Sequence, residues 1–329
     1  GMATQEFPLS RVLRFRRRGA EAESRRRRSE VVRTELDVAL EAARAFFMLY
    51  EVRAMVAILE TQIALANQLT QAAGARYGAA QGLAADVLRA ESEAARLEAE
   101  LVGLRARARG AEAMLNAALA RDPRLGVPEL VALDASDTSS AAPSVEIVVR
   151  LALEHRPELA ASESAIERAD ADIRVMRSMY APMAMIGIGS AYTMAEGPGL
   201  MGMIGLTAPI YRARLRSGVS EARAMASAAR AELEATRLMV AGEAARARAE
   251  LEAAAARRDA LRAAVVPRTR QAVDATLASY AAAALPLVSV LDAAQSLWSS
   301  EIALLEAEVA LGVALVELER ATGAMGDER

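Results

Sequence analysis

One long stretch of the sequence carries a helical pattern without a proline, and this stretch limits the possible folds more than any other feature. Within residues 20–75, apolar residues recur at alternating spacings of four and three, the heptad pattern of a helix seam. They are Leu36, Leu40, Ala43, Phe47, Tyr50 and Ala54. At about 1.5 Å per residue such a helix is roughly 80 Å long, too long for an ordinary globular domain. A partner helix must therefore run beside it.

The same alternation returns after a short run of small residues. We expect the chain to turn around Gly78–Gly82 and to continue as a return helix, which makes an antiparallel hairpin. The apolar positions of the return helix are Leu97, Leu101, Leu104, Ala108, Ala111, Leu115 and Ala118.

The turn segment has a counterpart later in the chain. "RYGAAQGLAADVLRA" at 76–90 and "SYAAAALPLVSVLDA" at 279–293 both place a tyrosine at the same distance before a Val-Leu-x-Ala step. Upstream of each copy, an arginine follows a proline by three residues, in "EFPLSRVLRFRRR" and in "TAPIYRARLRSG". A repeat of this kind indicates two related halves.

These halves define the expected organisation. Residues 1–120 form a partial first repeat, with a strand and a helical hairpin. Residues 121–144 are rich in turn formers and are expected to be a linker or equatorial loop. Residues 145–323 form the second repeat. In it we expect a short helix at 145–154, a helix from Pro157 to Met179, a β-hairpin at 183–210, and long helices at 217–278, broken near Pro267, and at 287–322.

The β-hairpin is predicted from a change of period. Ile186-Gly187-Ile188-Gly189 and Met201-Gly202-Met203 alternate with period two, and the turn formers "AEGPG" separate the two runs. Apolar residues outside and small residues inside suit strands of a membrane β-barrel. A soluble hairpin that packs on helices is the alternative.

Composition supports a mainly α fold of long, coiled-coil-like helical hairpins. Hydrophobic residues make up 53% of the chain, but aromatic residues only 3%, and alanine supplies much of the apolar total. Alanine buries little area, so each helix gains little stability but helices can approach closely. The net charge of -3 gives no bulk attraction to nucleic acid.

The residues offer no catalytic constellation, so we expect no enzyme, no cofactor and no metal site. The chain has no cysteine and a single histidine, His155, and no glycine-rich phosphate loop follows a strand. An arginine run at 11–28 could indicate a nucleic-acid arm. Because Phe15 is its one interleaved aromatic residue, we expect a solvated strand–helix junction there, and no nucleic-acid partner.

The order and spacing of several short motifs resemble the outer-membrane efflux factor family, the TolC-like trimeric channels. The motifs are "RPEL" at 156–159, Tyr-Ala-Pro at 180–182, "APIYRARLRSGVSEARA" at the end of the hairpin, and the two repeated tyrosine segments. The resemblance implies a channel in the cell outer membrane with a periplasmic helical extension. It also implies passive export of metal ions or drugs in a tripartite efflux or type I secretion-like system. The expected partners are a periplasmic adaptor, an inner-membrane pump, outer-membrane lipid and two further copies in a homotrimer.

The resemblance also implies two sets of functional residues. The hairpin tips are expected to dock the adaptor, with residues Tyr77, Gly78, Gly82, Leu83, Tyr280, Leu285 and Leu287. Asp274 matches an aspartate that lines the constricted periplasmic mouth in some family members, where three carboxylates would attract cations. An ordinary surface aspartate is the alternative.

Family members also carry a signal sequence, a helix and a strand ahead of the segment that matches "QEFPLSRVLRFR". We therefore expect a chain shortened at its N-terminus that offers about three strands where the family has four. A soluble coiled-coil scaffold is the alternative function, and the β-hairpin at 183–210 discriminates against it. The cargo and the class of pump cannot be read from these residues.

Overall fold

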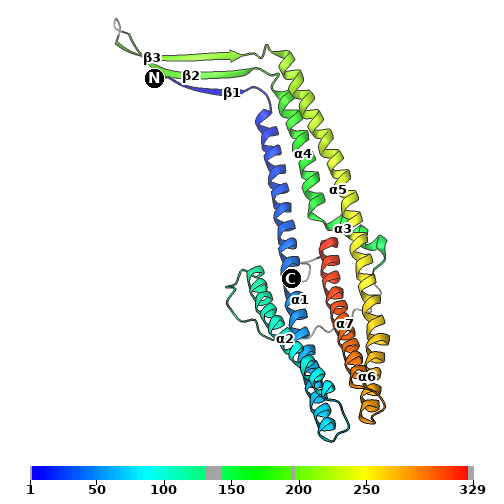
Figure 1. Ribbon diagram of the computed structural model, residues 1–329. Helices are drawn as coiled ribbons and strands as arrows, with labels where there is room; N and C mark the ends of the chain where they lie inside the picture. The colour runs from blue at the N-terminus through cyan, green and yellow to red at the C-terminus, as the bar shows by residue number, and fades with distance from the viewer. Residues whose placement is uncertain (1, 130–142, 194–196, 325–329) are drawn as a thin grey trace. The chain divides into compact units, whose positions relative to one another are not determined.

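The computed structural model describes residues 2–129, 143–193 and 197–324, and these are mainly helical (Figure 1). The elements in chain order are β1 (Met2–Pro8), α1 (Val12–Gly78), α2 (Ala84–Ala118), α3 (Val145–His155), α4 (Pro157–Ser178), β2 (Met183–Thr193), β3 (Gly197–Thr207), α5 (Arg212–Ala260), the π-helical turn η2 (Leu261–Val265), α6 (Val266–Ala281) and α7 (Leu287–Thr322). The predicted mainly α fold, with long helical hairpins and a small β portion, is confirmed.

The chain forms two compact units. The first unit comprises residues 1–35 and 152–242, which include the strands, α4 and the first parts of α1 and α5. The second unit comprises residues 36–151 and 243–329, which include α2, η2, α6 and α7. Each unit contains residues from both sequence repeats, so the units do not correspond to the repeats. The boundary between the repeats at 121–144 stays a prediction. Residues 130–142 of that linker lie outside the described part of the chain.

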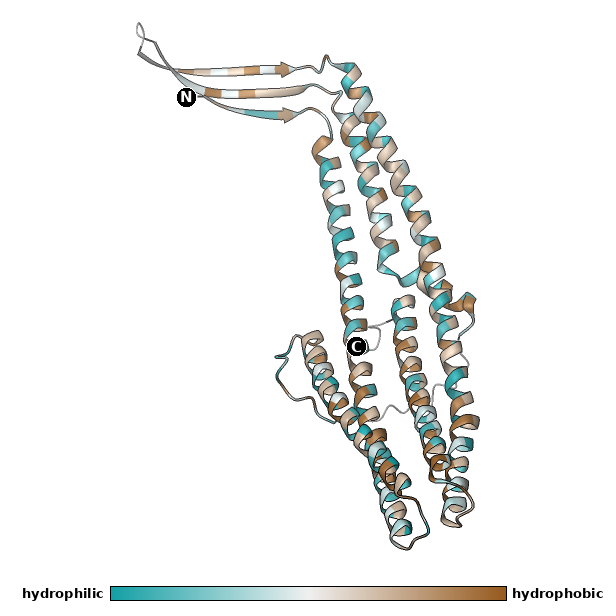
Figure 2. Cartoon of the chain, in the orientation of Figure 1, coloured by the Kyte–Doolittle hydropathy of each residue, from teal (hydrophilic) through white to brown (hydrophobic). Residues whose placement is uncertain are grey.

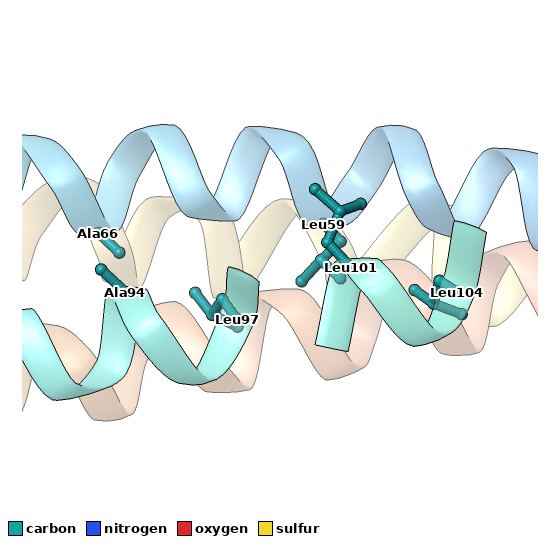
Figure 3. Packing of buried hydrophobic residues seen from close by; sticks show 6 residues of the cluster. All are labelled: Leu59, Ala66, Ala94, Leu97, Leu101 and Leu104. Carbon is teal, nitrogen blue, oxygen red and sulfur yellow. The ribbon is translucent and has the colours of Figure 1, made fainter. Parts of the chain in front are cut away.

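The core of the second unit follows the heptad pattern. In α1 and α2 the residues Leu59, Ala66, Ala94, Leu97, Leu101 and Leu104 form one buried cluster (Figure 3). Five of the seven apolar positions expected in the return helix are buried, namely Leu97, Leu101, Leu104, Ala111 and Leu115. Truncating one such leucine to alanine costs about 2–5 kcal/mol of stability. The antiparallel hairpin is therefore held by a leucine and alanine seam.

The break near Pro267 is a π-helical turn inside a continuous helical run. Proline has no N–H, so it cannot donate the α-helical hydrogen bond to the carbonyl of residue 263. Just before it, the N–H of Val266 donates to the carbonyl of Leu261, five residues back. The helix then resumes as α6 and ends at a turn before α7.

The arginine run begins at the expected junction between β1 and α1, where Arg11 is exposed, and then continues along the first part of α1. Helix α1 begins at Val12, and Figure 2 shows the turns that follow its first turn as mostly hydrophilic. Such a helix start has no apolar periodicity to reveal it. The carboxylate of Glu23 accepts hydrogen bonds from Arg26 and Arg168, which lower the pKa of Glu23 to about 2. Much of the run is therefore an exposed helical surface with acidic partners.

The sheet has the order β1-β2-β3, and both pairings are antiparallel. The register places Phe7 beside Ala184, Ile186 beside Ile204, and Ala184 beside Leu206, so these side chains share one face. Ile204 is 86% exposed on that face. The predicted hairpin is confirmed, although residues 194–196 between its strands lie outside the described part.

The "RPEL" motif starts α4. Arg156 is the N-cap residue, and Pro157 occupies the first turn as expected. The guanidinium of Arg156 donates two hydrogen bonds to the Glu158 carboxylate, at 2.9 and 2.8 Å. Both side chains are buried, at 2% and 10% exposure. The motif therefore builds a buried ion pair at the helix start.

Candidate functional site

The two tyrosine segments form helix ends with the same backbone geometry. At the first tip, the N–H of Gln81 donates to the carbonyl of Arg76 at 2.8 Å. At the second, the N–H of Ala284 donates to the carbonyl of Ser279 at 2.9 Å. These are six-residue Schellman bonds, and each encloses an alanine in the left-handed region, Ala80 with φ 57° and Ala283 with φ 58°. The turn predicted around Gly78–Gly82 is confirmed, and so is a turn between the helices expected at 217–278 and 287–322.

The expected tip residues divide into an exposed and a buried group. Tyr77 and Leu83 are 54% and 68% exposed, and Leu285 is 37% exposed. Gly78 is exposed and Gly82 is half-buried. In contrast, Tyr280 is 6% exposed and Leu287 is fully buried. A buried side chain cannot present an apolar surface, so within this chain these two residues support the tips from inside.

The buried group belongs to a cluster that joins both hairpins. Its residues are Leu69, Ala73, Ala90, Tyr280, Leu287 and Val290. Arg76 extends this link, because its guanidinium lies 4.6 Å from the centroid of the Tyr280 ring. The two tips therefore form one packed structure in the second unit.

Equivalent positions in the two tips differ in exposure. Tyr77 is exposed where Tyr280 is buried, and Ala84 is exposed where Leu287 is buried. Leu88, 66% exposed, corresponds to Leu291, which packs against the buried cluster. We did not expect Leu88 as a surface residue. The repeated Val-Leu-x-Ala step singles out Leu88 in the sequence. Because Leu88 and Leu291 occupy the same position of the repeat, the sequence does not show which of the two is exposed.

Asp274 lies exposed on α6, six residues before Tyr280. At about 1.5 Å per residue it stands roughly 9 Å along the helix from the tyrosine. It is not part of the buried cluster at the tips. A ring of carboxylates at this position requires further copies of the chain.

Among residues 2–129, 143–193 and 197–324, no three His, Cys, Asp or Glu side chains gather as metal ligands. His155 is exposed at the end of α3. Desolvation raises the pKa of Glu51, and the charge of Glu306 raises it further.

Within the same described ranges, no helix combines the length and apolar character needed to cross a membrane.

The chain combines long helical hairpins with a small antiparallel sheet that exposes apolar side chains. The profile of the family described as "Outer membrane efflux protein" matches residues 148–324. The chain belongs to this family.

Solved channels share its fold. The outer-membrane channel OprN is 20% identical, with a TM-score of 0.84 over 98% of this chain and 74% of that chain. The outer membrane protein VceC from Vibrio cholerae is 19% identical, with a TM-score of 0.80 over 98% and 78%. The open MtrE channel of Neisseria gonorrhoeae is 19% identical, with a TM-score of 0.82 over 98% and 74%. No curated protein matches the sequence.

Family membership establishes the chain as an outer-membrane efflux channel component with a helical extension in the periplasm. It favours this function over the soluble scaffold that composition alone left open.

Proposed function

We propose that the chain is a passive export duct for metal ions or drugs, and that its tips dock a periplasmic adaptor coupled to an inner-membrane pump. The observation that carries this proposal is the pair of matching turns in the second unit. Each turn exposes a leucine, Leu83 or Leu285, beside short side chains or glycine. Contiguous exposed apolar patches mark protein interaction surfaces, and we assign these two leucines to such a patch at the tips.

The unequal exposure of the two tips supports a homotrimer. Within the chain, the second tip buries Tyr280 against the first hairpin. Tyr77 and Leu88 present the corresponding face of the first tip to solvent. Repetition of the same contact between chains would cover them, and a contact of this head-to-tail kind forms a ring of three when successive copies are related by a third of a turn. We therefore assign Tyr77 to the seam between copies, where it borders the docking turns.

Asp274 is proposed to line the periplasmic mouth of that ring. Three copies would place three carboxylates around one axis, which favours cations and disfavours anions. Exposure of Asp274 within a single chain is consistent with this role.

The docking proposal is tested with charge at the turns. Leu83→Asp and Leu285→Asp should each lower export in cells at least tenfold, because a desolvated aspartate opposes an apolar contact. The readout is susceptibility to exported compounds, with the amount of protein in the outer membrane measured alongside. Leu238→Asp is the matched control, because Leu238 is 76% exposed on α5 and belongs to the first unit, whereas the turns belong to the second. Equal export by the tip variants and the control would contradict docking at these turns.

A further inference from the structure

The two faces of the sheet carry different kinds of side chain. One face holds the branched residues Ile186, Ile188, Leu200, Ile204 and Leu206, together with Phe7. On the opposite face, the described side chains include four methionines, Met183, Met185, Met201 and Met203. Among the described side chains of the strands, that second face has no Ile, Leu, Val or Phe. The methionines thus lie on a different face from the other large apolar residues of the strands. We infer that they do not simply replace leucine or isoleucine on a lipid-facing surface.

Glycines lie directly across the neighbouring strand from three of these methionines. Met185 is paired with Gly205, Met203 with Gly187, and Met201 with Gly189. A Cβ atom added at Gly205 would come within 3.1 Å of the Met185 methyl carbon, so the Met185 side chain extends across β2 toward β3. The glycines therefore leave room for each thioether to lie against the sheet and toward its neighbours.

The register arranges the four side chains in a continuous line. Met183 and Met185 are alternate residues of β2, and Met203 and Met201 are alternate residues of β3, each pair about 7 Å apart. Met185 and Met203 are diagonal neighbours across the strands, at about 7–8 Å between backbone positions. A methionine side chain has three rotatable bonds, so neighbouring sulfur atoms can converge on one ion. The partly exposed Met201 and Met203, at 48% and 36%, are open to solvent.

We propose that this methionine face is a binding track for soft monovalent cations, Cu(I) or Ag(I), on the duct side of the sheet. The inference rests on the proposed export function and names a substrate class for it. Thioether sulfur selects soft cations and is a poor ligand for Mg²⁺ or Ca²⁺. A row of neutral ligands also suits transit, because conduction requires several sites that bind weakly enough to release. Glu6, paired with Met185 across β1, adds a carboxylate on the same face.

The test measures Ag(I) binding in chloride-free buffer to the whole chain in detergent micelles, with methionine methyl groups labelled with ¹³C. The test variant combines Met183→Leu, Met185→Leu, Met201→Leu and Met203→Leu, which keeps apolar volume and removes sulfur. The control variant combines Met225→Leu and Met239→Leu, two exposed methionines of α5. Circular dichroism checks that both variants keep their helices.

We expect the four sheet methyl signals to shift together with Ag(I) and an excess of Zn²⁺ to leave them unchanged. The fourfold variant should bind Ag(I) at least tenfold more weakly, whereas the α5 variant should match the unsubstituted chain. Equal binding by both variants, or no binding by the unsubstituted chain, overturns the proposal.

A separate measurement distinguishes failure of the track from failure of the duct. Conductance of potassium ions through planar bilayers should be the same for the unsubstituted chain and the fourfold variant. If neither conducts, the duct function is contradicted, whatever the result for Ag(I) binding. If both conduct and Ag(I) binds equally to both, only the methionine track is contradicted.

Discussion

Arg76 holds Tyr280 by two contacts, a guanidinium 4.6 Å from the ring centroid and a 2.8 Å hydrogen bond from Nη1 to the tyrosine carbonyl oxygen. The equivalent position in the second tip is Ser279, which cannot make the same contacts with an aromatic ring. The two contacts therefore run in one direction, from the arginine of the first tip to the tyrosine of the second. They stabilise the second turn from the end of the first helix.

Replacing Arg76 with alanine should loosen the second tip. Loss of a cation–π contact and a charged hydrogen bond at a partly exposed site should cost about 1 kcal/mol. Hydrogen exchange at the amides of Ala283 and Ala284 should then become faster. Arg89→Ala, at an exposed position of α2, is the matched control. Equal protection of the two amides in both variants would contradict the link.

The left-handed alanines should accept glycine without loss of stability. An alanine in this region costs about 1–2 kcal/mol, which offsets the extra chain entropy that glycine brings to the unfolded state. Ala80→Gly and Ala283→Gly should therefore leave the free energy of unfolding unchanged or raise it. Ala253→Gly, at an exposed position inside α5, should lower it by about 1 kcal/mol. Similar losses at all three positions in thermal unfolding would refute the strain argument.

Glu51 should make stability depend on pH. Its folded pKa is raised, mainly by desolvation, so the unfolded chain releases the proton first as pH rises. Stability should fall as pH increases from the ordinary value of 4.5 through the raised value. Glu51→Gln should therefore be more stable than the unsubstituted chain at pH 7, and the advantage should vanish near pH 4. Glu98→Gln, on an exposed part of α2, supplies the control. An advantage of Glu51→Gln that did not change with pH would exclude this cause.

Tyr77→Ala and Leu88→Ala should weaken the trimer without unfolding the chain, because both side chains are exposed within one copy. Sedimentation in detergent should show at least a tenfold higher dissociation constant for each variant. Leu238→Ala should sediment like the unsubstituted chain, since that exposed leucine belongs to the first unit and the tips belong to the second. Equal dissociation constants of the trimer in all variants would exclude the proposed seam.

Asp274→Asn should reduce cation preference and block by divalent cations in single-channel recordings of the trimer. Unitary conductance should change little, because asparagine nearly keeps the side-chain volume. The physical reason is that three carboxylates close together repel one another, and cation binding relieves that repulsion. Unchanged selectivity and unchanged block would remove Asp274 from the pore, while the assignment of the tips would stand.

Much of the helical architecture could be predicted because heptad spacing is a local signal. Leu97, Leu101 and Leu104 mark a seam that can be read in the sequence and that is buried in the structure. The start of α1 was missed because the arginines between Val12 and Arg28 have no apolar rhythm. The pairing of β1 with β2 was not predicted either, since it joins residues far apart in the chain.

The candidate site was predictable only to the level of the repeated motif. The sequence makes Tyr77 and Tyr280 equivalent, and their backbones are equivalent too. Their exposures of 54% and 6% differ because only the second tyrosine packs against the other hairpin. Such an asymmetry depends on tertiary packing, which a local motif does not encode.

The enclosed alanines at both turns have a consequence for affinity. A glycine at these positions would let the free turn sample many backbone states, and binding would then have to freeze them. Alanine has fewer accessible backbone states, and the hydrogen bonds of each turn hold it in the left-handed region despite the strain, so association loses less conformational entropy. An adaptor would therefore meet a surface already set in its bound shape, and complementarity to that fixed shape would decide which partners the duct accepts.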